Sequence, residues 1–98
     1  MLERGGIRLR PGIGTVSYAS TCVFRARRVP HLVVQTDGGP VTVMVLRHQR
    51  PERATHFDES GFSGQIVPAG PGSIAVIGNA GADLEQVTAT VLTAVVWL

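Results

Sequence analysis

The chain has 98 residues, of which 44% are hydrophobic and 16% are charged, and its formal net charge is +2. This length predicts one small domain, and no apolar run reaches the roughly 18 residues that a membrane span needs. A single cysteine, Cys22, excludes an internal disulfide framework, fits a reducing compartment and favours a cytoplasmic protein.

The first 14 residues contain four glycines, one proline and three arginines. Such a segment has little to bury, so we expect a flexible basic N-terminal arm over residues 1–14 and a single small β domain over residues 15–98. Residues 16–24 then alternate between two faces, which predicts the first strand.

Residues 31–46 predict a β-hairpin. Two β-branched runs, residues 31–36 and 41–46, flank an Asp-Gly-Gly-Pro turn at residues 37–40. Both faces of these two strands are apolar, so we expect other parts of the protein to cover the sheet on both sides.

Residues 47–61 are the longest polar stretch, and Pro51 argues against a helix there, so we expect an exposed loop. Residues 62–67 and 73–77 predict a fourth and a fifth strand. The Pro-Ala-Gly-Pro-Gly segment between them supplies the backbone angles that a turn requires. These two strands therefore form a second hairpin.

The C-terminal segment has two interpretations. Asp83 and Gln86 resemble a capping box, and apolar residues follow at helical spacing, which predicts a helix. The alternative is a sixth strand, because residues 87–97 are rich in β-branched Val and Thr. We expect a mainly β (α+β) fold: a five-stranded antiparallel curled sheet or small open barrel, Sm-like or SH3-like, with a C-terminal helix.

Residues 22–46 and 57–78 resemble the C-terminal domain of a bacterial family of uncharacterised membrane-anchored proteins, some of them described as anti-sigma factors. In that family a transmembrane helix usually precedes this domain, which implies a periplasmic location if the chain is a fragment of such a protein. The chain also resembles, in fold, the Sm-like proteins, which form rings and bind RNA. Ile77 stands where Sm-like proteins carry an arginine that helps to hold a base.

The basic residues are all arginines, and six of the nine lie in the first 28 residues. Arg25, Arg27 and Arg28 are the candidate nucleic-acid contacts, because guanidinium groups bind phosphates bidentately. The favoured interpretation of these arginines is a solvated strand end and a loose N-terminal arm, because basic clusters alone are weak evidence for binding. Few charges on a small body, together with free strand edges, favour a non-catalytic interaction module that forms a homo-oligomer, with RNA binding as the second hypothesis.

Catalysis has little support in the sequence. Cys22 with His31 is the one nucleophilic arrangement, and a buried inert thiol is the favoured interpretation. Cys22, His31, His48 and His56 match no zinc spacing, and the adjacent Asp58 and Glu59 tend to point apart. A strand rather than a helix follows Gly72, which argues against a phosphate-binding loop. We therefore expect no enzyme activity, no metal and no cofactor.

Overall fold

The computed structural model describes residues 7–10, 15–24, 27–36, 38–47, 50–80 and 84–98. Within these residues it contains strands and one helix in the order β1 (Ile7–Leu9), β2 (Thr15–Phe24), β3 (Arg27–Thr36), β4 (Gly39–Leu46), β5 (Thr55–Glu59), β6 (Phe62–Ala69), β7 (Gly72–Asn79), α1 (Glu85–Ala94) and β8 (Val95–Trp97).

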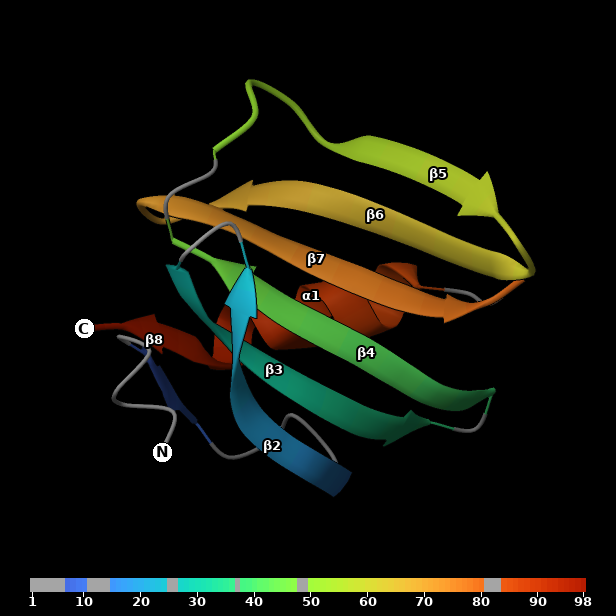
Figure 1. The fold of residues 1–98 in the computed structure, drawn as a ribbon, viewed down its shortest axis with the longest axis horizontal. Coiled ribbons are helices and arrows are strands. Elements are labelled where there is room, and N and C mark those ends of the chain that lie inside the picture. The colour runs from blue at the N-terminus through green and yellow to red at the C-terminus, as the bar shows by residue number, and fades with distance from the viewer. Residues whose placement is uncertain (1–6, 11–14, 25–26, 37, 48–49, 81–83) are drawn as a thin grey trace.

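The central feature is a six-stranded sheet in the order β2-β3-β4-β7-β6-β5, in which all neighbours are antiparallel. The sheet is strongly twisted and does not close on itself (Figure 1). A separate two-stranded sheet pairs β1 with β8. The mainly β prediction is therefore confirmed, whereas the prediction of five strands is wrong.

Both predicted hairpins are present. Residues 31–36 and 41–46 lie in β3 and β4, with Val34 opposite Val41, and β6 and β7 form the second hairpin, with Val67 opposite Ile74. Gly39 has a φ of 113° and Gly70 a φ of 48°, angles that side-chain-bearing residues rarely adopt. The glycines in the sequence therefore marked the turns correctly.

The polar stretch at residues 47–61 is not entirely a loop, because it contains β5. This strand forms one edge of the sheet, and of its five residues only Phe57 is even partly buried. Its neighbour β6 supplies the hydrogen bonds that the polar sequence did not suggest. β3 also begins earlier than expected, at Arg27 rather than His31.

The expectation of a flexible arm is wrong for residues 7–10. β1 pairs with β8, and the backbone N–H of Arg10 donates to the Ala94 carbonyl at 2.7 Å. Ile7 has no exposed surface and belongs to the main hydrophobic core. Residues 1–6 and 11–14 lie outside the described part of the chain.

The C-terminal segment combines the two interpretations of the sequence. It is helical over α1 and then turns into a strand at Val95, whose φ and ψ of −78° and 124° are extended. Asp83 of the expected capping box lies outside the described residues, and no side chain caps the helix at Leu84. The β-branched residues from Val95 onwards therefore extend as they would in a strand.

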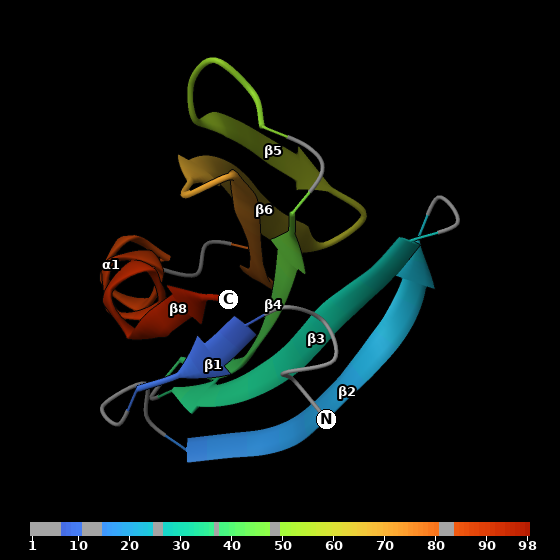
Figure 2. The same ribbon diagram turned by 90° about the vertical axis from the view of Figure 1, so that its left-hand side faces the viewer.

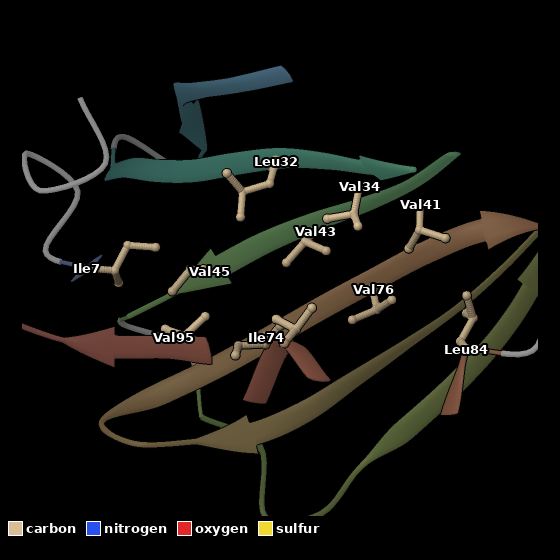
Figure 3. Packing of buried hydrophobic residues seen from close by; sticks show 11 residues of the cluster. Ile7, Leu32, Val34, Val41, Val43, Val45, Ile74, Val76, Leu84 and Val95 are labelled. Atoms are coloured by element: carbon tan, nitrogen blue, oxygen red, sulfur yellow. The ribbon is translucent and has the colours of Figure 1, made fainter. Parts of the chain in front are cut away.

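Buried hydrophobic residues lie on both faces of β3 and β4, and described elements outside the sheet cover one of these faces. On one face lie α1 and the β1–β8 pair (Figure 2). The core between these two layers contains Ile7, Leu32, Val34, Val41, Val43, Val45, Ile74, Val76, Leu84, Val91 and Val95 (Figure 3). A smaller cluster of Val29, Leu46 and Ala75, with Met44 and Ile66 against it, alternates with these residues along the strands and so belongs to the other face.

Candidate functional site

The β2–β3 hairpin carries two of the predicted nucleic-acid contacts. Arg27 and Arg28 are the first residues of β3 and lie opposite Phe24 and Val23 of β2. Arg25, between these strands in the sequence, lies outside the described residues. The backbone thus places the predicted arginines at one end of the six-stranded sheet.

The end of β4 lies at this same end of the sheet. Val29, which follows Arg28, packs in one cluster with Leu46, the last residue of β4. Arg47 comes next, and Arg50 and Arg53 follow in the segment between β4 and β5, both exposed to solvent. We call Arg27, Arg28, Arg47, Arg50 and Arg53 the arginine end.

Arg47 has a structural role at the arginine end. Its guanidinium donates to the backbone carbonyl of Leu98 and lies 5.8 Å from the centre of the Trp97 ring. The same ring packs against Gly70, where an added Cβ would come within 2.5 Å of the indole Nε1. Arg47 and Gly70 therefore hold β8 against the end of the sheet.

The Arg50 side chain is held by a hydrogen bond to the β6–β7 turn. Its Nε donates to the Gly70 carbonyl at 3.1 Å, which anchors the start of the exposed segment 50–54 to the β6–β7 turn. The long side chain is thereby held near one place on the surface, so less conformational entropy remains to be lost when its guanidinium binds a ligand.

The opposite end of the sheet is acidic. Asp58 and Glu59 are the last residues of β5, and the turn after them is joined to the end of β7 by the Ala80 N–H, which donates to the Gly61 carbonyl at 2.9 Å. Asp58 accepts a hydrogen bond from the Ser63 hydroxyl. β7 and its neighbour β4 each have eight residues, so the two ends are about 25 Å apart at roughly 3.3 Å per residue.

The sequence could not show that these arginines gather. It predicted the cluster at residues 25–28 from local spacing alone. Arg47 and Arg50 lie in a stretch that the sequence marked only as polar, and their partners Trp97, Leu98 and Gly70 are distant in the chain. The predicted hairpin places the end of β4 beside the start of β3, but the extension of β3 back to Arg27 and the contacts of Arg47 and Arg50 with distant residues were not predicted.

The candidate catalytic pair is not directly paired. Cys22 lies opposite Val29, whereas His31 lies opposite Ser20 on β2 and Met44 on β4. Among the residues whose placement is described, no three His, Cys, Asp or Glu side chains come together as a metal site would require. His48 lies outside these residues.

The two edges of the six-stranded sheet differ strongly. β5 has five residues and carries His56, Asp58 and Glu59, whereas β2 has ten residues with no charged residue, glycine or proline. No described strand pairs with the outer edge of β2. The pairing of β2 with β3 is irregular between Val16 and Tyr18 and regular from there to Phe24.

The fold thus defines a small antiparallel β domain with one covering helix. A family model described as "Protein of unknown function (DUF3379)" matches residues 1–95, and the chain belongs to this family. No curated protein and no solved structure matches the chain. The resemblance to Sm-like proteins therefore stays a prediction. In the described ranges, no helix has the length and hydrophobicity that a membrane crossing requires.

Proposed function

We propose that this domain is a non-catalytic assembly module that binds a second copy of itself through the outer edge of β2. The observation that carries the proposal is the difference between the two sheet edges. Natural sheets protect a free edge by making it short or by placing charges, prolines or bulges on it. β5 has the first two of these protections, because it is short and charged.

The edge of β2 is protected only near its start. The irregular pairing at Val16 and Tyr18 increases the local twist, but the seven residues from Tyr18 to Phe24 form a regular ladder with β3. Along this segment the outward N–H and C=O groups have no partner strand among the described residues. A second strand added there would satisfy these groups with main-chain hydrogen bonds.

A second copy of β2 fits this edge by symmetry. Two identical strands can pair antiparallel about a two-fold axis, and this isologous arrangement is the commonest form of a homodimer. A register centred on Thr21 pairs all of the regular segment. Tyr18 then lies opposite Phe24 of the partner subunit, and Phe24 lies opposite Tyr18 of the partner subunit. Arg27 and Arg28 then lie at opposite ends of the interface in the two copies, so their charges do not oppose each other.

The experiment compares the same substitution on the two sheet edges. Thr21→Lys introduces a charge at the centre of the β2 edge, and Thr55→Lys introduces the same charge on β5, where Thr55 is exposed. Mass is measured by size-exclusion chromatography with light scattering from about 1 µM to 1 mM protein, a range that covers association free energies of about −8 to −4 kcal/mol. Circular dichroism shows whether each variant is folded.

We expect the wild type and Thr55→Lys to dimerise with the same affinity. Thr21→Lys should remain folded and dimerise at least about tenfold more weakly, since like charges directly opposite each other destabilise a strand pair. A wild type that is monomeric throughout this range would overturn the proposal. An equal effect of the two lysines would show that self-association does not use the β2 edge.

A further inference from the structure

The described charges on the main sheet and on the segment between β4 and β5 are separated along the strands. Arg27 and Arg28 begin β3, and Arg50 and Arg53 follow the end of β4, at one end of the sheet, where Glu52 is the acidic residue among them. Asp58 and Glu59 lie at the other end. In a protein with a net charge of only +2, four arginines and one glutamate thus belong to segments at the arginine end.

The chemistry of the arginine end matches phosphate. A guanidinium group is planar, stays charged at all relevant pH values and donates two parallel hydrogen bonds to a phosphate. Arg50 is anchored by its Nε to the Gly70 carbonyl, and Arg53 is exposed three residues later. Arg27 and Arg28 begin β3 and contribute two further positive charges from a second segment.

We propose that the arginine end binds the phosphate backbone of a nucleic acid without reading its sequence. The Trp97 ring at this end already packs against Gly70 and lies beside the Arg47 guanidinium, so the proposed contacts are those of the arginines with phosphates. An anionic membrane is a poorer match, since surface-bound proteins also insert several apolar side chains. The described large apolar side chains that are exposed are Phe62, Leu92 and Leu98, and of these residues Leu98 accepts a hydrogen bond from Arg47 through its backbone carbonyl.

The test uses a fluorescein-labelled single-stranded oligonucleotide and fluorescence anisotropy over a series of salt concentrations. One variant carries Arg50→Gln and Arg53→Gln, and a second carries Arg27→Gln and Arg28→Gln. The matched control carries Asn79→Asp and Ala80→Glu, which lowers the net charge equally but at the acidic end, where both residues are exposed. Light scattering of the protein alone is run in parallel.

We expect wild type and control to bind the oligonucleotide with equal affinity at low salt and to lose it steeply as salt rises. Each double-glutamine variant should bind the oligonucleotide at least about tenfold more weakly. The slope of its plot of log affinity against log salt should be smaller in magnitude by about 1.4, because each phosphate contact on a single strand contributes about 0.7 to this slope. Oligonucleotides of unrelated sequence should bind alike.

Three results would overturn the proposal. The first is no binding at low salt with protein at about 100 µM, where even non-specific binders with Kd of about 10⁻⁴–10⁻⁶ M at physiological salt are detected. The second is an equal loss of affinity in the control, which would show that net charge alone is responsible. The third is binding to vesicles of anionic phospholipid without binding to the oligonucleotide. None of these results bears on the dimer, which light scattering reports separately.

Discussion

Replacing Ile7 with alanine should destabilise the whole domain, although Ile7 lies in a segment that the sequence marks as a flexible arm. Its side chain has no exposed surface and packs in the main core with Leu32, Val45 and Val95. The substitution removes three buried carbon groups at about 0.8 kcal/mol each, or roughly 2.4 kcal/mol of transfer free energy. With the cavity that remains, the free energy of unfolding should fall by about 3–4 kcal/mol.

Urea unfolding measures this loss, with the fluorescence of the single tryptophan as the signal. Trp97 lies opposite Ile7 in the β1–β8 pair, so its fluorescence reports on the altered region directly. Leu92→Ala is the control, because Leu92 is 40% exposed and its truncation should cost less than about 1 kcal/mol. If Ile7→Ala unfolds within about 0.5 kcal/mol of the wild type, β1 does not contribute to the core and the reasoning is refuted.

Three further predictions concern single contacts. Gln65 is 9% exposed and donates a hydrogen bond to the Thr88 hydroxyl. Gln65→Met and Thr88→Val should therefore each lower the free energy of unfolding in urea by about 1–3 kcal/mol, and the double variant should recover most of this loss. Additive losses in the double variant would contradict this prediction. No described group hydrogen-bonds to the fully buried Ser73 hydroxyl, so Ser73→Ala should keep or raise the melting temperature, and a clear fall would reveal a partner. At Gly70 an alanine would combine a φ of 48° with a clash against the Trp97 indole, whereas at Gly61 it would have a φ of 83° and no atom within 4 Å. Calorimetry should therefore show a larger loss of thermal stability for Gly70→Ala than for Gly61→Ala. Equal losses would mean that no clash occurs.

The parts of the fold that the sequence predicted share one property. The two hairpins combine β-branched apolar runs with glycine and proline at their turns, and α1 has apolar residues at helical spacing, so local pattern and tertiary structure agree in these elements. In β3 and β4 the apolar pattern on both faces agrees with buried residues on both faces, in the main core and in the smaller cluster.

The missed strands lack such a pattern. β5 is an edge strand with a single partly buried residue, Phe57, so its sequence is that of a loop, and its extended form depends on hydrogen bonds from β6. β1 has only three residues between glycine-rich segments, and it is ordered because Ile7 fills the core and β8 pairs with it. In each case the stabilising partner lies far along the chain.

The candidate sites show the same limit. Spacing alone marked Arg27 and Arg28, whereas the contacts that hold Arg47 and Arg50 involve Leu98, Trp97 and Gly70, which are distant in the chain. The free edge of β2 was likewise invisible in the sequence, because an edge strand and a central strand of this composition have the same alternation. Which strand lies at the edge is a property of topology alone.

Hydrogen–deuterium exchange of the backbone amides at low and high protein concentration tests the proposed β2 pairing most directly. If two copies join along β2, amides between Tyr18 and Phe24 should exchange more slowly as the concentration rises, while those of β5 between Thr55 and Glu59 should not change. Unchanged exchange in β2 across concentrations at which light scattering detects a dimer would contradict the account.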